Sequence, residues 1–175
     1  MFRTADGAGV KKIYLTGYTP SPYDFFGKLR PDFAKTALNA EKYVAWEQQK
    51  NVASLLAELK RKTPPSFGDL PLVRGGNNYF PSFTRRGLGR CFILSLEQSP
   101  RAISYDRFVS KHCNKLKRCD GVALIVGNEV RGLSQAILKK SDAIIEIPMH
   151  GKKESLNVAV AAGIALFALR DIGRR

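Results

Sequence analysis

The apolar run from Val158 to Leu169 constrains the fold more than any other part of the sequence, because it contains no charged residue. The run is shorter than the roughly 18 residues that a membrane-spanning helix needs. As a helix it is apolar on every face, and such a helix cannot face water. We therefore expect a helix from Leu156 to about Leu169, capped by Ser155, that lies in the core or packs against a second copy of the chain.

Upstream of that run, apolar strands alternate with segments of helical periodicity. We predict strands at residues 12–16, 91–96, 122–126 and 143–147, the end of a helix before residue 10, and helices at residues 47–61, 105–113 and 133–139. This alternation is typical of a mostly parallel α/β sheet flanked by helices. The length of 175 residues, 44% of them hydrophobic, predicts a single domain over residues 1–175. Residues 17–46 resemble an ordered functional loop, and residues 63–90, rich in glycine and proline, an irregular insertion.

The charge of the chain favours a polyanionic partner. Lysine and arginine number 29 against 15 acidic residues, which gives a net charge of +14. Residues 85–118 are the most basic stretch, and a solvated basic face is the alternative to an RNA-binding surface there. The candidate RNA contacts are Arg85, Arg86, Arg90, Lys115, Lys117 and Arg118, with Tyr79, Phe80 and Phe83 upstream as stacking residues and Arg30, Lys35, Lys42, Lys152 and Lys153 as an extension.

The three cysteines form no metal-binding pattern, and no secretory signal is visible. We therefore expect free thiols, no metal and no membrane partner. A soluble, cytoplasmic protein is the corresponding expectation.

Two segments each combine a buried strand, a break and the start of a helix. ALIVGNEVRGLS covers residues 123–134, and IEIPMHGKKESLNVAVAAGIALF covers residues 145–167. Ligands of α/β sheets bind at the carboxyl ends of the strands, where both breaks occur. Gly127 would allow a close approach of the backbone, and Gly132 would permit a turn. Each segment alone also fits a purely structural turn.

Together, in this order and spacing, the two segments resemble motifs 2 and 3 of the SpoU (TrmH-type) methyltransferases, members of the trefoil-knotted SPOUT superfamily. FRTADGAGVKKIYLTG resembles the end of the family's motif 1, KTALNAEKYVAWE its following loop, and LEQSPRAISY its next strand-to-loop segment. The resemblance implies methylation of a ribose 2′-hydroxyl in tRNA or rRNA with S-adenosyl-L-methionine as cofactor. It also implies a deep C-terminal trefoil knot and a homodimer.

The resemblance assigns residues to two parts of a site. It places Arg3, Glu129 and Asn157 in the catalytic pocket. Because a guanidinium with a pKa above about 12 gives up a proton reluctantly, we favour Arg3 as an oxyanion or phosphate clamp and keep its role as a base as the alternative. The cofactor-binding residues that it implies are Leu96, Glu97, Gly127, Ile147, Met149, Ser155 and Leu156.

Two features depart from the family pattern. Family members have a first strand and an asparagine ahead of the motif 1 arginine, so we expect that Met1 is not the natural start and that the chain lacks this strand. Residues 63–90 stand where relatives have a tight turn. An incomplete motif 1 leaves a catalytically weak RNA-binding module as the alternative function. A nicotinamide-dependent dehydrogenase is disfavoured, since DGAGV precedes a strand rather than following one.

Overall fold

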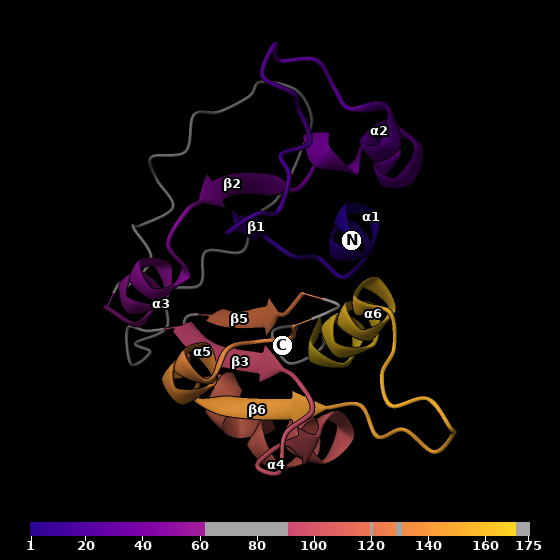
Figure 1. The fold of residues 1–175 in the computed structure, drawn as a ribbon. Coiled ribbons are helices and arrows are strands. Elements are labelled where there is room, and N and C mark those ends of the chain that lie inside the picture. Colours follow the sequence, from indigo (N-terminus) through magenta and orange to yellow (C-terminus); the bar gives the residue numbers. More distant parts are fainter. Residues whose placement is uncertain (62–90, 120, 129–130, 171–175) are drawn as a thin grey trace.

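The computed structural model describes residues 1–61, 91–119, 121–128 and 131–170, and Figure 1 shows how their helices and strands are arranged. The helices are α1 (Phe2–Gly7), α2 (Pro31–Ala37), α3 (Val52–Arg61), α4 (Tyr105–Leu116), α5 (Gln135–Lys140) and α6 (Val158–Leu169), with a 3-10 turn, η1 (Ala40–Lys42). The strands are β1 (Lys12–Thr16), β2 (Ala45–Gln49), β3 (Cys91–Leu96), β4 (Ile103–Ser104), β5 (Gly121–Val126) and β6 (Ala143–Glu146). No described helix is long and apolar enough to cross a membrane.

The described strands form two sheets in which all the pairings are parallel. One sheet has the order β4-β6-β3-β5, and the other consists of β1 and β2. In the larger sheet β3 is central, with Leu94 opposite Leu124 of β5 and Ala143 of β6. Parallel neighbours need crossover connections, and helices α4 and α5 lie in those crossovers. These pairings confirm the predicted parallel α/β fold.

The main hydrophobic core lies on one face of the larger sheet. Phe92 and Leu94 of β3 and Ile145 of β6 pack against Phe108 of α4 and Ala165 of α6, and each of them is at most 1% exposed. The side chains of a strand alternate between its two faces, so Ile93 and Ser95 point to the opposite face. Helix α3 also contacts β3. Fully burying a large apolar side chain stabilises the fold by about 1.5–3 kcal/mol.

A second, smaller core joins α1 to the β1–β2 sheet. Phe2 and Leu15 are buried in it, and the ring of Phe2 meets the ring of Phe33 edge to face at 5.1 Å. Helix α1 also contacts α6, beside which it lies in Figure 1. A Cβ on Gly163 of α6 would come within 3.2 Å of the Thr4 methyl carbon, so this glycine allows the two helices to approach closely.

The predicted helix over residues 47–61 is wrong in its first part. Residues 45–49 form β2, and α3 begins only at Val52. The strand is stabilised by its ladder with β1, along which Lys12 Nζ lies 2.6 Å from Glu47 Oε2. The hydrogen bond with Glu47 is the main reason that the pKa of Lys12 is raised above its ordinary value.

Other differences are local. Residues 17–46 contain α2 and η1 as well as loops, and Pro31 starts α2 at a position where a missing N–H does no harm. Helix α6 begins at Val158 rather than Leu156. Its cap is Asn157, whose Oδ1 accepts a hydrogen bond from the Ala159 N–H at 2.9 Å, and not Ser155 as predicted. The predicted insertion at residues 63–90 lies outside the described residues.

Candidate functional site

Three loops meet at the carboxyl ends of β3, β5 and β6. They comprise residues 97–102, the described residues 127–128 and 131–134, and residues 147–157. Adjacent parallel strands end at the same edge of a sheet, so the loops that follow them are brought together by the topology. The Glu97 N–H donates to the Ile145 carbonyl at 3.0 Å, which ties the first loop to β6. This is the sheet edge at which the sequence predicted ligand binding.

The Glu97 carboxylate holds two of these loops together. Its Oε2 accepts a hydrogen bond from the Leu133 N–H at 2.6 Å, and its Oε1 accepts one from the Gln98 N–H at 3.1 Å. Hydrogen bonds to an ionised acceptor are stronger than those between neutral groups. Glu97 therefore positions the loop after β5. Direct contact of Glu97 with a cofactor stays a prediction.

Two glycines are required for the shape of the loop after β5. A Cβ on Gly127 would lie 2.5 Å from the carbonyl carbon of Gly132. Gly132 has a φ of 60°, and a Cβ there would lie 2.5 Å from Glu97 Oε2. The Gly132 N–H closes the turn by donating to the Asn128 carbonyl at 2.8 Å. The close backbone approach expected at Gly127 is thus made by the protein's own chain, and glycine is needed at both positions.

A cavity of about 280 Å³ opens beside the loop after β6. Gln98 Nε2 donates to the Glu154 carbonyl, so this loop too is tied to the end of β3. The cavity is lined by Gln98, Glu146, Ile147, Pro148, Met149, Gly151, Lys153 and Glu154.

Two of the predicted cofactor residues, Ile147 and Met149, belong to this wall. The lining residues do not include the other five, which are Leu96, Glu97, Gly127, Ser155 and Leu156. Sequence reasoning missed Glu146 and Glu154 in the charged part of the wall, and it had placed Lys153 with the RNA contacts rather than with the cofactor site. Their position around the end of a buried strand was the signal that could have identified them.

Two of the three predicted catalytic residues belong to elements that lie side by side. Arg3 is an exposed residue of α1, and Asn157 caps α6, the helix that α1 contacts. The helix contact therefore brings the elements that carry Arg3 and Asn157 together. The third residue, Glu129, lies outside the described residues. The catalytic roles of all three stay predictions.

The predicted RNA-binding residues are partly described. Lys115, Lys117 and Arg118 are exposed around the end of α4, and Lys115 Nζ lies 5.2 Å from the centre of the Phe92 ring. Arg85, Arg86 and Arg90 lie outside the described residues, as do Tyr79, Phe80 and Phe83. Within the described ranges no three His, Cys, Asp or Glu side chains gather as metal ligands.

A family model matches the part of the chain that holds these loops, and curated proteins are similar to parts of the chain. The SpoU rRNA Methylase family matches residues 75–167. An uncharacterized tRNA/rRNA methyltransferase of Mycobacterium leprae is 30% identical over 118 residues, which are 67% of this chain and 35% of the relative. The 23S rRNA guanosine 2′-O-methyltransferase RlmP of Bacillus subtilis is 46% identical over 56 residues, 32% of this chain and 23% of the relative. The chain thus spans about a third or less of the curated relatives that it matches.

Solved structures share the fold over nearly the whole chain. An AdoMet-bound rRNA methyltransferase from Sinorhizobium meliloti has a TM-score of 0.65 at 21% identity, covering 97% of this chain and 49% of that one. A TrmH/SpoU tRNA modifying enzyme of A. aeolicus has a TM-score of 0.63 at 24% identity, covering 98% of this chain and 66% of that one. At these identities the likeness concerns the fold.

Proposed function

This chain belongs to the SpoU rRNA methylase family, and we propose that it transfers a methyl group from S-adenosyl-L-methionine to a ribose 2′-hydroxyl of tRNA or rRNA. The observation that carries the proposal is the meeting of three loops at the carboxyl ends of β3, β5 and β6, beside a cavity of about 280 Å³. The family match over residues 75–167 includes all three loops. The 2′-O-specificity of the Bacillus subtilis relative supports the ribose as target.

The cavity wall fits a ligand that is partly apolar and partly charged. Ile147 and Met149 offer apolar surface, while Lys153 and Glu154 offer opposite charges. Pockets for small ligands combine surfaces of these two kinds. When bound, S-adenosyl-L-methionine supplies a methyl group on a positively charged sulfur. Leu96, Gly127, Ser155 and Leu156 would complete the binding loops through their backbone and apolar groups.

The chain's own residues must align the ribose hydroxyl and stabilise the negative charge that develops on its oxygen. Arg3 is a permanent cation, so we assign it to clamp that oxygen or a neighbouring phosphate. Asn157 and Glu129 would orient the ribose and Arg3. The hydrogen bond to the Ala159 N–H holds the Asn157 side chain at the start of α6.

A homodimer is part of the same proposal. Helix α6 is apolar throughout, yet Val160 is 52% exposed and Phe167 is 41% exposed. A second copy would cover these side chains. Light scattering of the wild-type chain at micromolar concentration should report a dimer, and Val160→Lys should shift it to a monomer. The predicted trefoil knot of the C-terminal part belongs to this proposal too.

Two measurements test the cofactor and the reaction. S-adenosyl-L-methionine should bind in calorimetry and raise the melting temperature. Tritiated methyl groups should enter total tRNA or rRNA, at a ribose that mapping identifies. RNA affinity should fall steeply as salt is raised, because Lys115, Lys117 and Arg118 would neutralise phosphates. Methyl groups found on bases would contradict the ribose assignment, and cofactor binding without transfer would identify an RNA-binding module.

Gly127→Val gives the sharpest control for the cofactor site. Its Cβ would collide with the Gly132 backbone, so the loop after β5 must move. We expect the loss of cofactor binding while the far-ultraviolet circular dichroism spectrum is kept. If the variant binds the cofactor with the affinity of the wild type, the loop after β5 is not part of the cofactor site.

A further inference from the structure

Residues 23–29 form a short hairpin between β1 and α2, which we call the aromatic hairpin. Tyr23 and Leu29 make an antiparallel bridge at its base. The Asp24 N–H donates to the Lys28 carbonyl at 2.9 Å, so the two strands of the hairpin stay paired up to its tip. Only Phe25, Phe26 and Gly27 lie beyond that pair.

The tip itself is a closed turn. The Gly27 N–H donates to the Asp24 carbonyl at 3.1 Å, and the φ of 74° at Gly27 is one that glycine adopts readily. Asp24 Oδ1 accepts hydrogen bonds from the N–H groups of Phe26 and Lys28, both at 2.9 Å. The tip is therefore held in one conformation before any partner binds, which lowers the entropy lost on binding.

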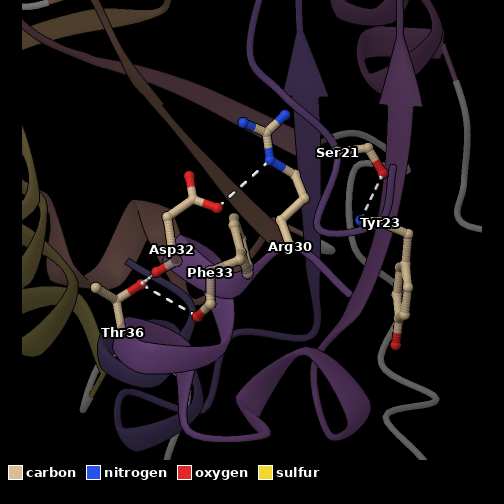
Figure 2. A network of polar contacts seen from close by, with 6 residues as sticks. All are labelled: Ser21, Tyr23, Arg30, Asp32, Phe33 and Thr36. Carbon is tan, nitrogen blue, oxygen red and sulfur yellow. Dashed lines mark hydrogen bonds and ion pairs between the residues drawn. The ribbon is translucent and has the colours of Figure 1, made fainter. Parts of the chain in front are cut away.

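The base of the hairpin is fixed to the rest of the fold. Pro22 is fully buried, and its carbonyl accepts a hydrogen bond from the Arg30 N–H at 3.0 Å. The Tyr23 ring stacks on Trp46 of β2, with the ring centres 6.1 Å apart. Figure 2 shows Tyr23 at this base, together with the ion pair in which Arg30 Nε lies 3.6 Å from Asp32 Oδ1.

Two aromatic rings project from this fixed turn into solvent. Phe25 is 98% exposed and Phe26 is 89% exposed, and their ring centres lie 5.7 Å apart with the planes at 86°. Single exposed apolar side chains are common on protein surfaces. Two adjacent rings on a hydrogen-bonded tip are different, because each ring offers an open face that nothing else in the described structure covers.

The net charge of the whole chain favours a polyanionic partner, and the two exposed rings favour one with flat surfaces. On the hairpin and just after it Lys28 and Arg30 balance Asp24 and Asp32; Lys28 is exposed beside the rings, where its ammonium can reach a phosphate. The whole chain carries +14. Exposed aromatic rings next to basic groups bind single-stranded nucleic acid by stacking on the bases while the cations contact phosphates. We propose that the aromatic hairpin binds unpaired bases of RNA by stacking on Phe25 and Phe26, an inference that rests on the proposed function for its choice of RNA.

The test compares RNAs that differ in their bases. The double variant Phe25→Ser/Phe26→Ser and the wild type are titrated with a labelled single-stranded adenylate oligonucleotide, its duplex with uridylate, and an abasic chain of the same charge. We expect the double variant to bind the single strand at least about tenfold more weakly, as the loss of one or two stacked bases implies. Its affinity for the duplex and for the abasic chain should stay that of the wild type.

Matched variants separate stacking from other effects. Tyr43→Ser removes an aromatic ring that is 76% exposed on a different segment and should leave all three affinities unchanged. The variants Phe25→Trp and Phe26→Trp keep an aromatic ring at both positions, so they should bind the single strand with the wild-type affinity. The fluorescence of the new indole should be quenched by the adenylate strand but not by the abasic chain. Because Phe25 and Phe26 are exposed, all these variants should melt at the wild-type temperature.

Three results would overturn the inference. The first is equal affinity of the double variant and the wild type for the single strand. The second is an equal loss for the abasic chain, which would assign the contact to phosphates. The third is a change in oligomeric state, or in binding to phosphatidylcholine vesicles, with RNA affinity unchanged, which would make the rings a contact with a second copy or a lipid surface.

Failure of this inference can be distinguished from failure of the proposed function. Methyl transfer by the wild type with unchanged RNA affinity in the double variant contradicts the hairpin's role alone. Stacking in the wild type without cofactor binding or methyl transfer contradicts the proposed reaction alone. In the double variant, methyl transfer at saturating RNA should match the wild type, with only the RNA concentration for half-maximal rate raised about tenfold.

Discussion

The two sheets of this protein bury their strands to very different degrees. In β3, four consecutive residues from Phe92 to Ser95 are at most 1% exposed, whereas in β1 only Leu15 is buried. Two strands alone are marginally stable, so the β1–β2 sheet depends on contacts with α1 and η1. The comparison indicates that the larger sheet supplies the rigid frame for the three loops, while the N-terminal part presents α1 and the aromatic hairpin from a less buried base.

The two parts also differ in whether their buried polar side chains have hydrogen-bond partners. Ser95 in the larger sheet is fully buried, and its Oγ lies 2.6 Å from Ser141 Oγ. Glu41 in η1 is 4% exposed, and neither of its carboxylate oxygens has a hydrogen-bond partner within the described part of the chain. Because an unpaired buried carboxylate is costly, the N-terminal part is further from its optimal stability.

The largest effects on stability are expected from truncating core side chains, and these variants test the difference between the two parts most directly. Phe108→Ala should lower the free energy of unfolding by about 3–5 kcal/mol, since it opens a cavity in the main core. Phe33→Ala in the small core should have a clearly smaller effect, because Phe33 is only partly buried. Urea unfolding of the two variants measures the difference. Equal losses would show that both parts contribute alike.

The second largest effect is expected from removing the Glu97 carboxylate, which holds the loops after β3 and β5 together. Glu97→Ala should destabilise the protein by about 1.5–3 kcal/mol, as expected for hydrogen bonds to a charged group. It should also weaken cofactor binding, because the loop after β5 loses its tie to β3. Glu154→Ala is the control for stability alone, since there the backbone carbonyl makes the bond, while the carboxylate lines the cavity. If the Glu97 variant keeps the melting temperature and the cofactor affinity of the wild type, Glu97 does not position the loop after β5.

Substitutions of the two buried polar side chains, Glu41 and Ser95, should change the free energy of unfolding in opposite directions. Glu41→Gln should raise the free energy of unfolding by about 1–2 kcal/mol, because the described part of the chain gives this carboxylate no hydrogen-bond partner and a neutral amide costs less to bury. Ser95→Ala should lower it by about 1 kcal/mol through the loss of the bond to Ser141. Denaturant titrations at neutral pH give both values. Destabilisation by Glu41→Gln would mean that this carboxylate has a partner.

The smallest effect is expected at the ion pair between β1 and β2. The hydrogen bond to Glu47 raises the pKa of Lys12, so its stabilisation is fully present below the ordinary lysine value of 10.5 and is lost as the pH rises through the folded-state value. Because both side chains are about 40% exposed, Lys12→Met should cost less than about 1 kcal/mol at pH 7. The difference from the wild type should vanish in strongly alkaline solution; a pH-independent difference would assign the effect to packing.

Local patterns in the sequence determined much of the fold and pointed to the site. The apolar strands at residues 91–96 and 122–126 and the apolar helix before Leu169 were predicted correctly, because each is a continuous apolar run. In β3 such a run reflects burial on both faces. Gly127 after the strand at residues 122–126 and Pro148 after the strand at residues 143–147 placed two of the three loops at the correct edge of the sheet. The resemblance of the same loops to a methyltransferase family is consistent with the match over residues 75–167.

Only the tertiary structure decided the features that depend on distant partners. Residues 45–49 form a strand because β1 lies beside them, whereas the predicted helix had been extended back to Glu47 from apolar residues whose helical periodicity begins at Val52. The Glu97 carboxylate binds the Leu133 N–H 36 residues away, which no local pattern encodes. The strand order β4-β6-β3-β5 and the cap at Asn157 in place of Ser155 are of the same kind. Hydrophobic periodicity reports burial one segment at a time, whereas hydrogen bonds between segments depend on which of them the folded chain brings into contact.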